Sequence, residues 1–525
     1  CGPENLNASL LPPCRRVGFT PNLPSIMGLN AFSILAQAAV EAEYDTFRLV
    51  SVLVLSIILI LVLILAFRIQ AFVSLLLAAI FVGIASGTME LIEVGDTIKD
   101  GMGGALGFIA TIIGLGAIFG QMIEHSGGAQ SLANGMLRTF GEKRANWAML
   151  LTGFLISIPV FLDVGVVILA PIIYALARKS RKSVLVFALP LLAGMAVTHA
   201  FVPPTPGPLI IAENLGQPAG NAIIAGLLAS IIPVVLVMWL ANRFNDKLDI
   251  PLRETKGSSL NELGKIVKKK DDELPGFCMS VLPVLLPVVL ISMVTFLGLA
   301  AKFGMTVSPE LKKWLEFVGN KNVAMFIAAL IAMYTLAKQR GWTMEKLGES
   351  MGTPLETAGV IILITGAGGA FGSMIGHSGI GDTIKEIGKD LEGGTALMLF
   401  MAWLLTAVIR AAQGSATVSM ITGSGIMAPI LASMLEAGTL GCHPIYFCLA
   451  IGFGAFPLSW MNDSGFWVVQ RMSGFTEKET LKTWTVMLTA IGVVGIIQVI
   501  VMATVLPLKP EASEAPAKTA QVSSV

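Results

Sequence analysis

Two charged side chains lie deep within long apolar stretches of this 525-residue sequence. Asp163 falls in the middle of the apolar run 146–177, and Arg410 falls within the run 396–435. An isolated charge in hydrocarbon is costly, so such residues generally pair with one another, bind a ligand or carry a proton. Desolvation favours the protonated form of a carboxyl group, which makes Asp163 a candidate proton carrier. The alternative is that Asp163 only caps the following helix as a hydrogen-bond acceptor.

Two roles are open for Arg410. Its guanidinium could hold a substrate carboxylate through two parallel hydrogen bonds, or it could form a structural ion pair with Asp163 or Asp463. Replacement by lysine would separate the two roles, because an ammonium group cannot reproduce the bidentate geometry. We predict that Arg410 binds substrate and that Asp163 and Asp463 are the proton-coupling residues.

Polar groups near interruptions of the apolar runs complete the candidate site. Ser415 and Thr417 follow a glycine in the run 396–435, and His199 precedes a cluster of prolines. Hydroxyl and imidazole groups suit a hydroxylated organic anion, although serine and threonine also bond back to their own helix and a buried histidine can simply hold a break in place. The predicted substrate-binding residues are Arg410, Ser415, Ala416, Thr417, His199, Thr205, Gly207, Asn462 and Ser464.

The elements that carry these residues are predicted to be membrane helices. Hydrophobic residues make up 54% of the chain and charged residues 13%, and the mean hydropathy is +0.79. This composition excludes an ordinary water-soluble enzyme and predicts an all-α polytopic protein in the lipid bilayer. The five cysteines and four histidines show no metal-ligand spacing, and the net charge of +1 gives no basic surface for nucleic acid. We therefore expect no cofactor, no metal and no nucleic-acid partner.

Apolar runs of two kinds follow one another along the chain. Interrupted runs each read as two half-length helices or as one unwound helix. In lipid, broken helices persist only where protein or a water-filled cavity satisfies their backbone, so the breaks predict a midplane site for an anion. The uninterrupted runs are 49–67, 69–89, 101–123, 218–241, 277–301, 320–337, 357–376 and 483–508, and the interrupted runs are 146–177, 184–212, 396–435 and 444–470.

The chain also repeats internally. Residues 114–128 and 366–380 share nine of fifteen positions at an offset of 252. If each interrupted hairpin re-enters, each half has an odd number of crossings, which predicts two inverted-topology repeats, each with a re-entrant hairpin and a discontinuous helix. Most Lys and Arg then lie on one side, which the positive-inside rule makes cytoplasmic. The predicted segments are an N-terminal tail 1–48, a first repeat 49–242, a charged cytoplasmic linker 243–276, a second repeat 277–508 and a polar tail 509–525.

Four motifs in order carry a family resemblance: FLDVG at 161–165, THAFVPPTPGP at 198–208, GSATV at 414–418 and NDSGFW at 462–467. With them, residues 49–507 resemble the gluconate:proton symporter (gluconate permease, GntP) family of the ion transporter superfamily. The resemblance implies a multi-pass inner (plasma) membrane importer of gluconate or another small sugar or hydroxy acid, driven by protons. It also implies a homodimer with elevator-like movement.

The same resemblance places Asp163 where the family has a tip carboxylate, Arg410 with 415–417 in the second tip, and Asn462 with Asp463 in the second break. One departure concerns the substrate. Gluconate permeases of the family often have histidine where this chain has Thr205, at a position where substrate hydroxyls would be read.

Other functions fit less well. A sodium-coupled carboxylate carrier would share the architecture, but its Ser-Asn-Thr tips are missing from this sequence. An intramembrane hydrolase could use Asp163 and His199, yet no Gly-x-Ser-x-Gly or His-Glu-x-x-His pattern is present. A channel could use broken helices as a filter, but saturable, gradient-driven accumulation would exclude it.

Overall fold

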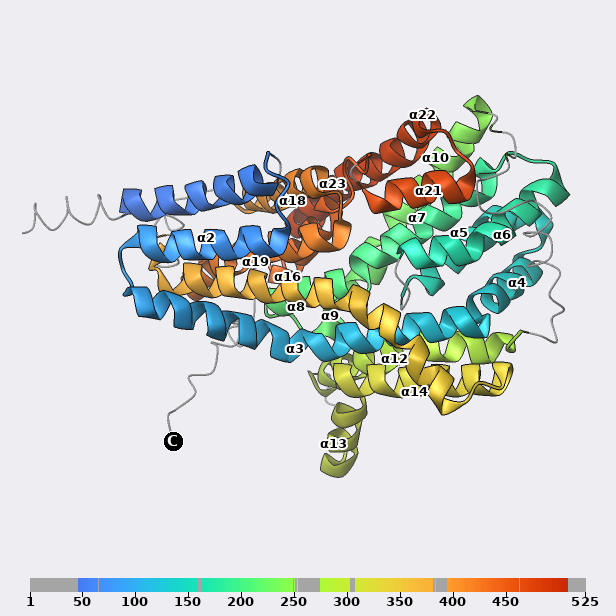
Figure 1. Cartoon of the computed structure of the whole chain (residues 1–525), viewed down its shortest axis with the longest axis horizontal. Helices are drawn as coiled ribbons and strands as arrows, with labels where there is room; N and C mark the ends of the chain where they lie inside the picture. Colours follow the sequence, from blue (N-terminus) through green and yellow to red (C-terminus); the bar gives the residue numbers. More distant parts are fainter. Residues whose placement is uncertain are drawn as a thin grey trace, which may run out of the picture. The chain divides into compact units, whose positions relative to one another are not determined.

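The structure is a computed structural model that describes residues 46–508, except 65, 159–161, 249, 251–252, 254–273, 303–306, 381–382, 384–393 and 462. The tail 509–525, nearly all of the tail 1–48 and most of the predicted linker lie outside the described residues. Residues Leu49–Val525 form one compact unit, and all regular elements within its described part are helical. The all-α prediction is confirmed (Figure 1).

Membrane-length helices dominate the described part of the chain. Eight are long and apolar enough to cross a bilayer, or nine if the bent α3 counts as one span. The helices are Thr46–Ile64, α2 Ala71–Ser86, α3 Leu91–Ser126, α4 Gly128–Phe140, α5 Ala145–Ile156, α6 Leu162–Ser180, α7 Leu185–Phe201, α8 Pro206–Asn214, α9 Ala219–Ala229, α10 Ile231–Lys247, α12 Phe277–Lys302, α13 Pro309–Val318, α14 Lys321–Arg340, α15 Met344–Ser350, α16 Gly352–His377, α18 Thr395–Gln413, α19 Ala416–Glu436, α20 Pro444–Gly454, α21 Ser464–Ser473, α22 Glu477–Thr480 and α23 Val486–Val505, with short turns at Glu142–Arg144 and Leu481–Thr485.

The predicted interruptions are confirmed. The run 184–212 is divided into α7 and α8, where Thr205 is the N-cap of α8 and a proline occupies its first turn. Proline lacks an N–H but is tolerated at the start of a helix, so the proline cluster ends one helix and begins the next. Likewise α5 stops at Ile156 before α6 starts at Leu162, and a gap separates α20 from α21.

Most hairpin arms are longer than the predicted half-length. Helices α6, α18 and α19 have 19, 19 and 21 residues, or about 30 Å each at 1.5 Å per residue. Only α5, with 12 residues, is a short arm. The reason at the second hairpin is Gly414, whose left-handed backbone (φ 79°) turns the chain at one residue without unravelling either helix. Helix α10 similarly runs to Lys247, past the expected linker start at Arg243.

Helices α3 and α16, which end in the two repeated segments, pack against each other in antiparallel fashion (Figure 1). A methyl group on Gly101 would lie 2.8 Å from the carbonyl oxygen of Gly369, whereas one on Gly114 would lie 3.6 Å from Leu355. Residue numbers therefore rise on one helix as they fall on the other. Matched helices of an inverted repeat would be related in this way, but the inverted repeat itself stays a prediction.

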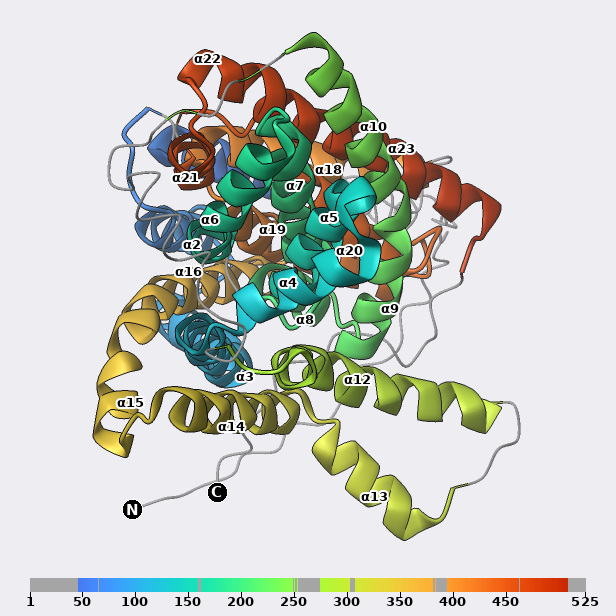
Figure 2. The same ribbon diagram turned by 90° about the vertical axis from the view of Figure 1, so that its right-hand side faces the viewer.

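The helix that carries His199 lies inside the protein. In the stretch Leu185–Asn214, 94% of the most apolar window is buried, against 39% for Ala219–Lys247. Helix α7 packs on α5, α6 and α10 (Figure 2). The approach to α5 is close, because a methyl group on Gly153 would lie only 2.1 Å from the carbonyl oxygen of Leu191. The α7–α8 break is thus held in a rigid protein environment away from lipid.

Candidate functional site

The turn between α18 and α19 positions the central residues of the site. The N–H of Gly414 donates to the Arg410 carbonyl oxygen at 2.9 Å and closes α18. One residue later, Ser415 caps α19, and its hydroxyl accepts a hydrogen bond from the N–H of Val418 at 3.3 Å. The turn therefore places a guanidinium at the end of one helix beside the N-terminus of another. Both features attract an anion.

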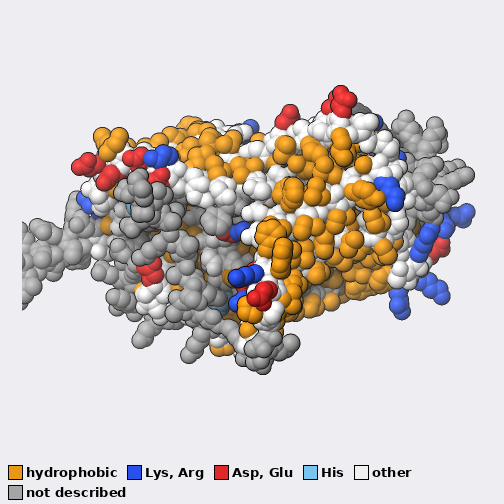
Figure 3. Space-filling view, turned by 90° about the horizontal axis from the view of Figure 1, so that it is seen from below, with side chains coloured by type: hydrophobic (Ala, Val, Ile, Leu, Met, Phe, Trp, Pro, Cys, Tyr) orange, Lys and Arg blue, Asp and Glu red, His pale blue; other side chains and the backbone are white. Residues whose placement is uncertain are grey.

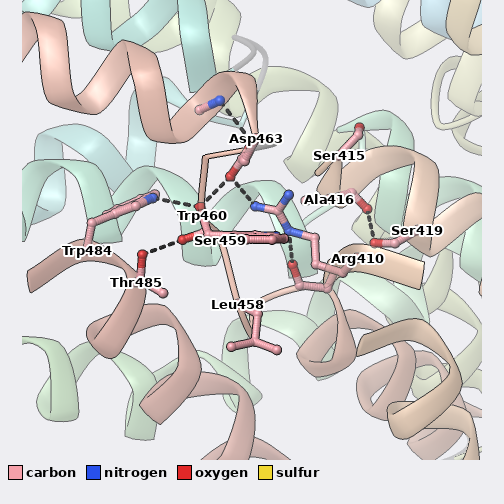
Figure 4. A network of polar contacts seen from close by, with 12 residues as sticks. Arg410, Ser415, Ala416, Ser419, Leu458, Ser459, Trp460, Asp463, Trp484 and Thr485 are labelled. Atoms are coloured by element: carbon pink, nitrogen blue, oxygen red, sulfur yellow. Dashed lines mark hydrogen bonds and ion pairs between the residues drawn. The ribbon is translucent and has the colours of Figure 1, made fainter. Parts of the chain in front are cut away.

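Arg410 is buried, with 3% of its surface exposed. Its Nη2 forms an ion pair with Oδ2 of Asp463, and its Nε donates to the carbonyl oxygen of Ala455 at 3.0 Å (Figure 4). Among the residues that the structure describes, Nη1 has no hydrogen-bond partner. Of the two roles predicted for Arg410, the pairing with Asp463 is confirmed, and its role in substrate binding stays a prediction.

Asp463 is the second buried charge, with 5% exposed. One carboxylate oxygen caps α21 by accepting from the N–H of Gly465 at 2.9 Å, and the other accepts from the hydroxyl of Ser459 as well as from Arg410. Ser459 in turn accepts from the indole Nε1 of Trp484 at 3.0 Å. Trp484 belongs to the π-helical turn Leu481–Thr485, a distortion that is frequent at functional sites. Both carboxylate oxygens of Asp463 are thus held by hydrogen bonds from the surrounding protein.

A neutral contact joins the two remaining broken segments. Nε2 of His199 on α7 lies 2.9 Å from Oγ1 of Thr417 on α19, and both side chains are buried. Farther along, the side-chain amide of Asn214 on α8 donates to the hydroxyl of Ser424 on α19 at 2.8 Å. The α7–α8 break and the α18–α19 break therefore face each other, and a shared substrate site between them stays a prediction.

The structure places the other predicted residues as follows. Thr205 is buried, but its hydroxyl donates to the Val202 carbonyl oxygen at 2.7 Å, which stabilises the break. Gly207 lies against Met420 of α19, and Ala416 is the first residue of α19. Asp163 and Ser464 occupy the first turns of α6 and α21, with side chains that the structure does not describe, and Asn462 lies outside the described residues.

Sequence reasoning missed several groups that hold the site. Ser459, Trp484 and the carbonyl oxygen of Ala455 all serve the Arg410–Asp463 pair. They lie 45 to 74 residues from Arg410 in the sequence, so no local pattern pairs them with it. Met420, which packs on Gly207, was missed for the same reason.

The chain matches the model of the GntP family permease over residues 48–505. It is 35% identical over 465 residues to the gluconate permease of Pseudomonas aeruginosa, covering 88% of this chain and 99% of that protein. It is 37% identical over 459 residues to the inner membrane permease YgbN of Escherichia coli, covering 86% and 97%. Among solved structures it resembles the YdaH transporter of Alcanivorax borkumensis, with a TM-score of 0.54 and 15% identity over 78% of this chain and 88% of that one. At that identity the likeness concerns the fold alone.

Proposed function

This chain belongs to the GntP permease family, and from that premise we propose that it imports gluconate or a closely related sugar acid in symport with protons. It is a multi-pass inner-membrane transporter and not an enzyme. The observation that carries the proposal is the buried guanidinium of Arg410, which is neutralised by Asp463 and whose Nη1 has no hydrogen-bond partner among the residues that the structure describes.

The substrate would bind where the two breaks meet. Its carboxylate would accept a hydrogen bond from Nη1 of Arg410, near the positive end of the α19 dipole. Its hydroxyls would exchange hydrogen bonds with Thr417 and His199, which contact each other in the absence of substrate. Thr205 is a weaker candidate contact than the sequence suggested, since its hydroxyl hydrogen already bonds to Val202.

Charge balance supports a proton as the coupled ion. The empty site is neutral, because Arg410 is paired with Asp463. Gluconate alone would add one negative charge to this buried site, and a proton alone would add one positive charge; both are costly to move through a low-dielectric barrier. Gluconate together with a proton on Asp463 gives a neutral site again. We therefore infer that the empty and the fully loaded carrier move readily, with one proton carried per substrate.

Protonation of Asp463 would also free the guanidinium of Arg410 to bind the substrate. The carboxylates of Asp463 and of the substrate compete for the same guanidinium, and a neutral Asp463 competes poorly. Asp163 stays the second predicted proton-coupling residue. Homodimer assembly, elevator-like movement and the inverted repeat also stay predictions from the resemblance.

The test is uptake of radiolabelled gluconate into proteoliposomes with an imposed pH gradient. We expect accumulation that a protonophore abolishes and that unlabelled gluconate blocks. If gluconate is not taken up and another hydroxy acid competes for uptake, the substrate assignment is wrong but the proton-coupled mechanism is retained. Accumulation that follows a sodium gradient and ignores the protonophore would instead favour the sodium-coupled alternative.

A further inference from the structure

A polar hollow that shares no residue with the candidate site lies where three helical segments reach the edge of the apolar region. It has a volume of about 420 Å³ and is lined by the turn Glu142–Arg144 with the start of α5, the residues before α7, and the end of α10. Beside the hollow, α7 is the start of one membrane-length apolar span, and α10 is the end of the next. The hollow therefore opens at the membrane surface, at the depth of lipid headgroups.

The hollow is electropositive. Lys143 and Lys182 line it, and among the described residues neither of them forms an ion pair. The one acid in its lining, Glu142, is paired with Lys179, whose hydrogen bond lowers the pKa of the carboxyl group. Glu142 is thus already neutralised by a third lysine. Figure 3 shows Lys and Arg side chains gathered beyond the broad hydrophobic surface, at the end where α4 and α6 lie in Figure 1.

Amide groups add hydrogen-bonding capacity. Asn146, Asn242 and Asn245 line the hollow together with the two lysines. The side-chain oxygen of Asn146 already accepts from the N–H of Trp147 at 2.9 Å, so its NH₂ group is what remains for a ligand. Ammonium and amide donors on several sides suit a phosphate group.

An apolar stripe continues from the hollow down the lipid-facing side of α10. Ile231, Val235 and Trp239 are exposed by 58%, 58% and 61%, and Asn242 follows three residues later in the lining. Residues spaced by three or four lie on one face of a helix. Tryptophan at this level is typical of the membrane interface. The polar hollow matches the headgroup of a phospholipid, and the apolar stripe matches its acyl chains.

We propose that this hollow binds the phosphate headgroup of an anionic phospholipid, such as phosphatidylglycerol, whose acyl chains lie along the exposed stripe of α10. Charge complementarity selects an anionic over a zwitterionic headgroup, and the stripe selects a lipid over a free phosphate ion. The site is independent of the proposed transport site.

Native mass spectrometry of the purified full-length protein tests the proposal, with phosphatidylglycerol and phosphatidylcholine of identical acyl chains as probes. We expect K143Q/K182Q to bind phosphatidylglycerol about 30-fold more weakly, since each basic residue near a membrane surface contributes roughly 1 kcal/mol. The matched control K478Q/K482Q removes the same charge from exposed lysines that lie outside the hollow and should bind like the wild type.

Equal binding by both double variants, or equally tight binding of phosphatidylcholine by the wild type, would overturn the proposal. A second arm replaces the lipid with inorganic phosphate. If phosphate alone displaces phosphatidylglycerol as effectively as the lipid itself does, the hollow is a free-anion site and the lipid assignment is wrong. Should K143Q/K182Q fail to fold, N242A/N245A removes amide donors from the exposed end of α10 and is expected to weaken phosphatidylglycerol binding in the same direction.

Discussion

Two contacts close the candidate site, and they differ in kind. Between α7 and α19, in the described part of the chain, a neutral hydrogen bond joins the imidazole of His199 and the hydroxyl of Thr417. Between α18 and the α20–α21 break there is a charged contact in which Arg410 and Asp463 are joined to each other and to surrounding donors and acceptors. A neutral hydrogen bond contributes about 1 kcal/mol, whereas breaking a buried ion pair costs about 3–5 kcal/mol.

The difference indicates that the two contacts have separate roles in transport. The neutral contact can open and re-form cheaply, as a contact that yields to a substrate hydroxyl must. The charged contact is costly to break unless a compensating charge arrives. A proton on Asp463 and a carboxylate on Arg410 supply that compensation together, which is the physical basis of the proposed coupling.

The largest effect is expected for R410Q. This change removes the carboxylate anchor and leaves Asp463 without its counter-ion, so gluconate uptake should fall by about two orders of magnitude. R410K should also lose most uptake, because an ammonium group lacks the rigid planar fork with which a guanidinium holds two carboxylates in fixed positions. The matched control is R340Q, which removes an arginine that bonds to the His125 carbonyl oxygen outside the site. If R410K transports normally, Arg410 serves only as a charge partner.

Removal of both the Arg410 and the Asp463 charge separates the effect on stability from the effect on transport. R410Q alone should lower the thermal unfolding midpoint, since it leaves a buried carboxylate uncompensated. The double variant R410Q/D463N should recover much of that loss, because replacing a buried pair with neutral groups is often close to neutral for stability. Its uptake should stay as low as that of R410Q. Recovery of uptake in the double variant would contradict a direct role of Arg410 in substrate binding.

The hydrogen bond between His199 and Thr417 should affect uptake less than the Arg410–Asp463 pair does. T417V removes the hydrogen bond to His199 and should reduce uptake about fivefold, the equivalent of about 1 kcal/mol. The control is T422V on the same helix, because the buried hydroxyl of Thr422 has no hydrogen-bond partner in the described part of the chain. T422V should leave uptake unchanged. Equal losses in both variants would mean that helix packing, not the His199 contact, sets the effect.

The smallest effect is expected for G207A. A methyl group there would lie 2.2 Å from the terminal carbon of Met420, but a methionine side chain can move aside. Uptake should stay within about twofold of the wild type. G153A is the contrasting variant, since its methyl group would meet the Leu191 backbone at 2.1 Å and should destabilise the fold by about 1–3 kcal/mol. A strong loss of uptake in a stable G207A protein would place the glycine in contact with substrate.

The breaks that build the site could be predicted from sequence because proline and glycine act locally. The prolines at 203–208 end α7 whatever surrounds them, and Gly414 turns the chain by its own backbone conformation. The partner of Arg410 could not be chosen in advance, since Asp163 and Asp463 were equally plausible and the choice depends on long-range packing. Helix lengths were predicted wrongly because each break was taken to leave two half-length arms, although the 40-residue run 396–435 is long enough for two full-length helices, as α18 and α19 show.

The most direct test of the coupling account is transport by D463N in proteoliposomes, measured both as exchange and as net uptake. Without the carboxylate, the empty site carries the positive charge of Arg410, while the gluconate-loaded site is neutral. The loaded carrier should therefore still cross and the empty carrier should not return. We predict that D463N exchanges internal for external radiolabelled gluconate at any pH but no longer accumulates it in response to a pH gradient. Protonophore-sensitive accumulation by D463N at the wild-type level would contradict the account.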